Sequence, residues 1–257
     1  MGTICVTGAA SGIGAATRRQ LEAAGHRVIG VDLHDTEVIA DLATADGRAA
    51  MVEGVTAASG GVLDGLVAGA GVNGAGPALV VAVNYFGAVA TLLGLRPLLA
   101  RGAQPAAVAI SSNSSTTMQG IVDATVEACL GGDEAAAVAT AEAAGDIVDY
   151  PSSKLALARW VRRQAPAAEW IGAGIRLNAI APGPTATPMT EDMTVPVLDL
   201  GDLYPVPIQR LATADEQAAV IAFLLSASAS YVVGAVIPVD GGGDAAARAD
   251  DWPTART

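Results

Sequence analysis

Val6-Thr7-Gly8-Ala9-Ala10-Ser11-Gly12-Ile13-Gly14 joins an apolar run over 3–6 to a helical pattern over 12–24. Glycine permits a tight turn and lets a pyrophosphate approach the start of a helix, where free N–H groups and the helix dipole attract anions. The spacing G-x-x-x-G-x-G is weak by itself in a chain with 30 glycines, and the alternative is an ordinary strand-to-helix turn. Its place between a strand and a helix predicts dinucleotide binding. The cofactor-binding candidates in this turn are Gly8, Ser11, Gly12, Ile13 and Gly14.

The rest of the chain continues this alternation of short apolar runs and longer helical patterns. We expect strands at 3–6, 27–31, 37–40, 63–69, 106–110, 175–180 and 235–239, and helices at 12–24, 45–58, 79–100, 150–165 and 214–225. The apolar runs are near-continuous, as in strands that are covered on both faces. The pattern predicts a single-domain α/β fold: a Rossmann-type, doubly wound parallel sheet of about seven strands with helices on both faces. Ligands of such sheets bind beyond the carboxyl ends of the strands.

Length and composition exclude several classes of protein. The chain has 257 residues, which suits one α/β domain. Hydrophobic residues make up 52% and charged residues 16%, so the chain is not a disordered polymer. A formal net charge of −12 argues against nucleic acid or an anionic membrane surface as a partner.

Cysteine usage and the expected lack of a signal peptide predict an ordinary cytoplasmic protein. Cys5 and Cys129 make no disulfide framework, and no His, Cys and carboxylate cluster suggests a metal, so we expect none. No basic segment precedes the first strand, so we expect no signal peptide. The apolar stretch 62–85 is interrupted by Asp64, Asn73 and Pro77, which predicts that it does not span a membrane.

Asp32 ends the second predicted strand, about two dozen residues after Gly8. A carboxylate there accepts hydrogen bonds from the adenosine ribose hydroxyls and repels a 2′-phosphate. No Arg or Lys follows it directly, so NAD is favoured over NADP; the alternative is a surface acid at a strand end. Asp41 and Leu42 follow the third strand and are candidates for contacts with the adenine edge. A helix-capping role for Asp41 is an equal alternative.

Tyr150 and Lys154, in Tyr150-Pro151-Ser152-Ser153-Lys154, are the strongest single signal. Lys154 is the one lysine of the chain. Residues four apart share a helix face, so an ammonium can lie beside the phenol and lower its pKa toward neutrality. A guanidinium, which is never deprotonated, would not relay a proton. The pair predicts a proton-transfer group; the alternative is a half-buried tyrosine beside a solvated lysine.

These motifs together resemble those of the short-chain dehydrogenase/reductases, in order and across nearly the whole chain. They are the turn at 7–14, Asp32, Asn84, Ser112, Tyr150, Lys154, Asn178-Ala179-Ile180-Ala181-Pro182-Gly183 and Asp240-Gly241-Gly242. The resemblance implies that Ser112 hydrogen-bonds the substrate oxygen, that Asn84 completes a water relay to Lys154, and that Thr187 orients the nicotinamide carboxamide. The further cofactor contacts that it implies are Ala70, Gly71, Tyr150, Lys154, Pro182, Gly183 and Thr185.

Two of these assignments have alternatives. Ser112 best matches the family's position after the fifth strand, but Ser111, Ser114 and Ser115 crowd it. Asn84 could instead mark a simple irregularity in a helix.

The chain departs from the family pattern in two places. The usual Asn-Asn-Ala-Gly after the fourth strand is Ala68-Gly69-Ala70-Gly71 here, so one hydrogen-bonding side chain is absent. The interval between Ser112 and Tyr150 is also far longer than usual. We expect a helical insertion at 113–149, with helices at about 121–130 and 133–144, next to the active site.

That insertion narrows the resemblance to the bacterial 3α-hydroxysteroid dehydrogenase/carbonyl reductases. The stretches Glu37–Leu42, Val83–Gly87 and Gln104–Val108 are also similar. This resemblance implies a steroid or another bulky apolar alcohol or ketone as substrate. The segment 184–212 is predicted to form a movable apolar lid, or else simply to pack on the core. Its candidate lid residues are Met189, Met193, Val195, Val197, Leu198, Leu200 and Leu203.

The sequence therefore predicts an NAD-dependent oxidoreductase that transfers hydride between NAD(H) and a secondary alcohol or ketone. The alternatives are the same chemistry on a non-steroid small alcohol, and a non-catalytic NAD-sensing protein on the same scaffold. Family analogy implies a homo-oligomer, and we expect a dimer rather than a tetramer.

Overall fold

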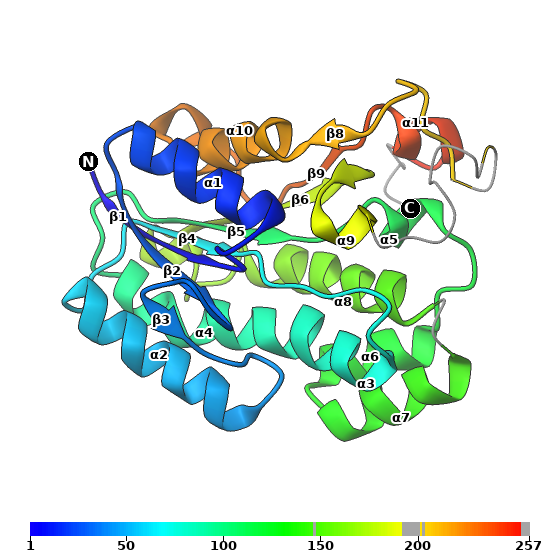
Figure 1. The fold of residues 1–257 in the computed structure, drawn as a ribbon, viewed down its shortest axis with the longest axis horizontal. Helices are drawn as coiled ribbons and strands as arrows, with labels where there is room; N and C mark the ends of the chain where they lie inside the picture. The colour runs from blue at the N-terminus through cyan, green and yellow to red at the C-terminus, as the bar shows by residue number, and fades with distance from the viewer. Residues whose placement is uncertain (146–147, 192–200, 202–203, 253–257) are drawn as a thin grey trace.

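Seven parallel strands form the central sheet of the computed structural model, in the order β3-β2-β1-β4-β5-β6-β9 (Figure 1). The structure describes residues 1–145, 148–191, 201 and 204–252. The strands are β1 (Thr3–Thr7), β2 (Arg27–Asp32), β3 (Val38–Ile39), β4 (Gly65–Ala68), β5 (Ala106–Ile110), β6 (Arg176–Pro182) and β9 (Val236–Val239). The predicted fold class and all seven predicted strands are confirmed, although β3 is shorter than expected.

The strand order reverses between β1 and β4. From β1 the chain builds outward through β2 to β3, and then crosses back to place β4 on the other side of β1, with Thr7 opposite Ala68. The helices that follow β1 and β4 therefore diverge from this point, which opens a crevice at the carboxyl ends of the strands. The glycine turn after β1 lies in that crevice.

Helices cover both faces of the sheet. Helices α1 (Gly12–Ala23) and α10 (Ala214–Leu225) pack together on the upper face in Figure 1, and α2 (Ala45–Ser59), α4 (Ala88–Leu99) and α8 (Asp149–Gln164) lie below. Alternate strand residues supply the two cores: Ile4 and Val6 belong to the α1/α10 side, and Cys5 to the other. This alternation explains why the strands read as continuous apolar runs. Cys5, expected in the first strand, is fully buried there.

The helix expected at 79–100 is interrupted. It consists of α3 (Pro77–Val81), a π-helix η1 (Ala82–Gly87) and α4. The run Pro77–Leu99 is long and apolar enough to cross a membrane by length and composition, but 67% of its most apolar window is buried inside this structure. It contacts α2, β4 and β5, so it is a core helix of the domain.

The insertion after β5 contains three short helices. The two predicted ones are α6 (Asp123–Gly131) and α7 (Glu134–Ala144), and a further helix, α5 (Ser114–Thr117), precedes them. Gly132 ends α6 with a φ of 77°, and the Asp133 carboxylate accepts a hydrogen bond from Ala136 N at 3.0 Å to begin α7. The insertion packs against α8 and α3, at the right-hand end of the lower layer in Figure 1.

Several small elements were not predicted because they are too short to show a period. Strand β7 (Thr185–Ala186) pairs with β8 (Ala212–Thr213), and α9 (Pro188–Glu191) follows β7. Near the C-terminus, α11 (Gly243–Ala247) follows β9. The described part of the chain also contains the 3-10 helices η2 (Ile171–Ala173) and η4 (Ala227–Ala229). The β7–β8 pair fixes both ends of the segment that was predicted to be a lid.

Arg176 at the start of β6 is buried, and its guanidinium closes the end of α10. It donates hydrogen bonds to the carbonyls of Leu224, Ala229, Leu225 and Ser226 at 2.7–3.2 Å. The last carbonyls of a helix have no helical partner, so this side chain satisfies groups that would otherwise be buried without one.

We therefore expect Arg176→Met to lower the free energy of unfolding by about 2–4 kcal/mol in a urea titration. The control is Arg101→Met, because exposed Arg101 donates one hydrogen bond to a single carbonyl, that of Gly61. Equal effects of the two substitutions would contradict the prediction.

Candidate active site

A cavity of about 800 Å³ opens beyond the carboxyl ends of the strands. Every residue predicted to contact cofactor or substrate lines it except Asn84. They are Gly8, Ser11, Gly12, Ile13, Gly14, Asp32, Asp41, Leu42, Ala70, Gly71, Ser112, Tyr150, Lys154, Pro182, Gly183, Thr185 and Thr187. The fold thus brings segments from most of the chain to one place.

The glycine turn has no room for a side chain at Gly8 or at Gly14. A Cβ on Gly14 would lie 2.0 Å from the Gly8 carbonyl oxygen, and a Cβ on Gly8 would lie 2.9 Å from the Ala70 backbone. Gly8 also has a φ of 74°. The Ser11 hydroxyl precedes α1 without capping it, so it stays available at the helix N-terminus. This cradle fits a pyrophosphate.

Thr7 holds the loop after β4, where the sequence departs from the family pattern. Its hydroxyl accepts hydrogen bonds from Gly69 N at 3.0 Å and Ala70 N at 3.2 Å, and donates to Val67 O. Thr7 therefore ties the end of β1 to the loop after β4, on the two sides of the crevice.

Asp32 lines the cavity and also braces the glycine turn. One carboxylate oxygen accepts from Ala10 N at 2.9 Å, and the other from Leu33 N at 2.8 Å. Asp41 lies further along the same wall and accepts from Ala43 N at 2.9 Å. The capping alternative for Asp41 is wrong, because the N-cap of α2 is Thr44, whose hydroxyl accepts from Gly47 N.

Tyr150 and Lys154 lie on one face of α8, at the floor of the cavity. The Lys154 side chain is buried, and its Nζ donates to Ile110 O at 2.9 Å and lies 5.6 Å from the centre of the Tyr150 ring. Burial lowers the pKa of Lys154 from 10.5 to about 8. The lysine is therefore positioned to exchange its proton near neutral pH.

One sequence expectation about this pair is wrong for the cofactor-free protein. Burial raises the pKa of Tyr150 above its ordinary value, and a hydrogen bond with Ser112 opposes that rise only in part. The physical reason is that a phenolate loses more by leaving water than it gains from an ammonium directed at the Ile110 carbonyl. Further positive charge is needed in the cavity to reverse the shift.

The hydrogen bonds separate Ser112 from its serine neighbours. Ser111 donates to Lys154 O at 2.8 Å, and Ser115 donates to Ser112 O at 2.6 Å, so both hydroxyl protons serve the backbone. Ser112 Oγ instead accepts from Ser114 N and Ser114 Oγ, at 3.2 and 2.9 Å. Its own proton is therefore free for the hydrogen bond with Tyr150, which also lines the cavity.

Asn84 lies behind the cavity wall, in the π-helix η1. Its amide group forms two hydrogen bonds with the Val72 backbone, at 2.8 and 2.9 Å, and Nδ2 approaches Ser153 Oγ at 3.4 Å. A Cβ added to Gly71 would lie 3.2 Å from Asn84 Oδ1 and 3.3 Å from Lys154 Nζ. The helix irregularity is therefore real, and it places Asn84 beside the lysine.

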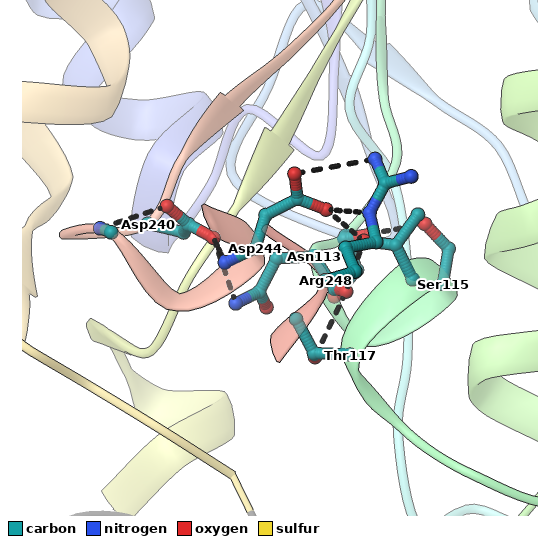
Figure 2. A network of polar contacts seen from close by, with 9 residues as sticks. Asn113, Ser115, Thr117, Asp240, Asp244 and Arg248 are labelled. Carbon is teal, nitrogen blue, oxygen red and sulfur yellow. Dashed lines mark hydrogen bonds and ion pairs between the residues drawn. The ribbon is translucent and has the colours of Figure 1, made fainter. Parts of the chain in front are cut away.

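The residues after Ser112 belong to a polar network that the sequence analysis missed (Figure 2). Asn113 donates to Asp240 Oδ2 at 3.3 Å. It also accepts from the Tyr204 hydroxyl. Asp240 also accepts from Asp244 N, and Asp244 pairs with Arg248 and Thr116. Tyr204 lines the cavity, where burial, followed by the neighbouring Tyr150, raises its pKa. Asn113 lies more than 90 residues from Tyr204 and from Asp240, so the sequence gives no signal for these two contacts.

Of the predicted lid residues, Met189 is described. It belongs to α9, lines the cavity and is 38% exposed. The other six lie outside the described residues: Met193, Val195, Val197, Leu198, Leu200 and Leu203. In the described part of the chain, no group of three or more His, Cys, Asp and Glu side chains could hold a metal ion.

Comparison with known proteins gives consistent matches along the chain. Residues 2–124 match the family model for short chain dehydrogenase, and residues 134–244 match that for Enoyl-(Acyl carrier protein) reductase. The chain is 45% identical over 256 residues to the 3-alpha-hydroxysteroid dehydrogenase/carbonyl reductase of Comamonas testosteroni, covering 96% of this chain and 98% of that one. It is 34% identical to a coniferyl-alcohol dehydrogenase of Pseudomonas sp. (strain HR199 / DSM 7063), covering 93% and 95%.

Solved structures agree. The 3-alpha-hydroxysteroid dehydrogenase from Pseudomonas sp. B-0831, complexed with NADH, superposes with a TM-score of 0.90 at 44% identity, covering 96% of this chain and 99% of that chain. A levodione reductase structure gives a TM-score of 0.74 at 28% identity, covering 95% and 98%.

Burial of Lys154 should lower the free energy of unfolding by an amount that depends on pH. Below its folded pKa of about 8, Lys154 is charged in both states, so folding bears the full cost of burying the ammonium. Between pH 8 and about 10.5 the unfolded chain binds more protons, so the cost declines as pH rises.

We expect Lys154→Met to raise the free energy of unfolding at pH 7 by about 1–3 kcal/mol in the absence of cofactor. Urea titrations at pH 7 and near pH 10 should show this gain shrinking as pH rises. A gain that stays constant, or grows, with pH would refute the assignment of a buried charge.

Proposed function

This chain belongs to the short-chain dehydrogenase/reductase family, and we propose that it transfers hydride between NAD(H) and a bulky apolar secondary alcohol or ketone. The observation that carries the proposal is the convergence of Ser112, Tyr150 and Lys154 on a cavity that also holds the glycine turn. A non-catalytic NAD-sensing protein would not need a proton-transfer group with a buried lysine beside it.

The proposed mechanism uses Tyr150 as the proton-transfer group. The substrate oxygen lies between the Ser112 hydroxyl, which donates a hydrogen bond, and the Tyr150 phenol. In oxidation Tyr150 accepts the hydroxyl proton, and in reduction it returns that proton to the carbonyl oxygen. NAD, when bound, supplies the hydride acceptor and the positive charge of its oxidised ring.

Lys154 stabilises the Tyr150 phenolate and can return a proton to it. The ammonium lies close to the Tyr150 ring, and its lowered pKa of about 8 lets it release a proton near neutral pH. Asn84 forms two hydrogen bonds with the Val72 backbone, next to Lys154. We propose that this placement continues a proton relay away from the substrate, as the family resemblance implies.

Asp32 supports a preference for NAD over NADP. Its carboxylate lies on the cavity wall one strand away from the glycine turn. Neither Leu33, His34 nor Asp35 supplies a fixed positive charge for a 2′-phosphate. The proposed adenosine ribose therefore meets an acceptor, and a 2′-phosphate meets a like charge.

An apolar substrate fits the other end of the cavity. Met118, Pro151, Met189 and Tyr204 line it there, and Met118 belongs to the insertion. The relative at 45% identity is named a 3-alpha-hydroxysteroid dehydrogenase/carbonyl reductase. We therefore propose a 3α-hydroxysteroid or a comparable carbonyl compound, with a smaller secondary alcohol as the second candidate. A cytoplasmic location and a homodimer stay predictions.

Tyr150→Phe should lower kcat/KM for alcohol oxidation by about 10²–10⁴-fold, because the variant has no group to accept the proton. NADH binding, measured by fluorescence titration, should be unchanged. The same assay of kcat/KM with NAD compares a 3α-hydroxysteroid with small secondary alcohols as substrates of the wild-type protein. Wild-type turnover by the variant would refute the mechanism, and activity on small alcohols alone would refute the steroid proposal.

Asp32→Asn should shift the cofactor preference toward NADP. The amide keeps an acceptor for Ala10 N but removes the negative charge, so the ratio of kcat/KM for NAD to that for NADP should fall by about 10–100-fold. Asp35→Asn is the control, since exposed Asp35 lies three residues away and does not line the cavity. An unchanged ratio in Asp32→Asn would exclude Asp32 as the selector.

A further inference from the structure

Arg48, in the first turn of α2, connects three segments that are far apart in the sequence. Its Nε donates to Leu42 O at 2.7 Å, and its Nη2 donates to Ala43 O at 3.2 Å and to Ala82 O at 2.9 Å. Its two terminal nitrogens also bind the two carboxylate oxygens of Glu134, each at 2.7 Å. The Arg48 side chain is 13% exposed, and that of Glu134 is 38% exposed.

Each of these partners belongs to a different part of the site. Leu42 lines the cavity together with Asp41, and we call the part of the lining that these two residues form the Leu42 wall. Ala82 is the first residue of η1, which contains Asn84. Glu134 is the first residue of α7, within the insertion. One guanidinium therefore joins the cavity wall, the π-helix and the insertion.

The packing around this guanidinium leaves the Leu42 wall little freedom. A Cβ on Gly87 would lie 3.0 Å from Leu42 Cβ, so η1 lies directly behind that wall. Arg48 also lies 5.9 Å from the centre of the Phe86 ring in η1. If Arg48 were removed, the carbonyls of Leu42, Ala43 and Ala82 would lose their donor, and the wall would lose its connection to the insertion.

We propose that Arg48 and Glu134 are positioning residues that hold the Leu42 wall in place for the adenine end of the dinucleotide. The inference rests on the proposed use of NAD. The planar guanidinium offers Nε to the wall while its terminal nitrogens pair with a carboxylate, an arrangement that a lysine cannot reproduce. The insertion thus supports the cofactor end of the cavity through Glu134, in addition to lining the substrate end through Met118.

The test compares binding of NADH and of ADP-ribose, which contains the adenine end but no nicotinamide. We expect Arg48→Met to raise the Kd of both ligands by about tenfold, and Glu134→Gln by about threefold. Arg48→Lys should not restore tight binding. The KM for the alcohol at saturating NAD should stay near the wild-type value, because Arg48 contacts the insertion at Glu134 and not at Met118, which lines the substrate end.

Arg27→Met is the matched control, because Arg27 donates one hydrogen bond to Ala58 O, at the opposite end of α2. It should leave both Kd values unchanged. A double-mutant cycle adds a second criterion: in the Arg48→Met background, Glu134→Gln should have no further effect.

An ADP-ribose Kd equal to the wild-type value in the Arg48→Met variant would overturn the inference while leaving the proposed function intact. If that variant does not fold, Glu134→Gln carries the same test, since its carboxylate is partly exposed and the arginine keeps its carbonyl partners. A folded wild-type protein that binds neither ligand would instead overturn the proposed use of NAD and this inference with it.

Discussion

The close approach of two backbone segments at the sheet's switch point is the constraint on which the rest of the site depends. Gly8 lies against the Ala70 backbone, and Gly14 lies so near Gly8 that any side chain on either glycine would collide. The Thr7 hydroxyl joins the two segments across the crevice. Because the segments that follow β1 and β4 lead to helices that diverge from this point, the contact lies at the base of the crevice in which the cavity opens.

Burial produces opposite effects on the two groups proposed to move protons. It lowers the pKa of Lys154 to about 8 and raises the pKa of Tyr150. Without cofactor, the site therefore favours a neutral phenol and weakens the charge beside it. The positive charge of an oxidised nicotinamide would favour the Tyr150 phenolate, so the proposed base would form chiefly in the loaded site. The cost in stability is local and is offset by the two apolar cores.

The insertion is part of the site rather than an addition to its edge. Met118 lines the cavity, and the N-terminal residue of α7 pairs with Arg48 behind the cavity wall. On the opposite side, Asn113 connects the serine loop to Tyr204 and to Asp240 after β9. The cavity is thus supported by segments from the middle and the end of the chain, and Met118, Glu134 and Asn113 lie in the insertion, outside the strand-and-helix repeat.

The sequence by itself determined the fold class, the seven strands and the Tyr150–Lys154 pair, because each rests on local information: apolar runs, glycine at a turn, and a four-residue helix spacing. It favoured Ser112 among the four serines only through the family resemblance, and it could not assign Asp41 or find Tyr204 and Arg48. The roles of Tyr204 and Arg48 depend on hydrogen bonds between residues far apart in the chain, namely those of Tyr204 with Asn113 and of Arg48 with Glu134. It also predicted the wrong direction for the Tyr150 pKa, since desolvation depends on the burial that tertiary packing produces.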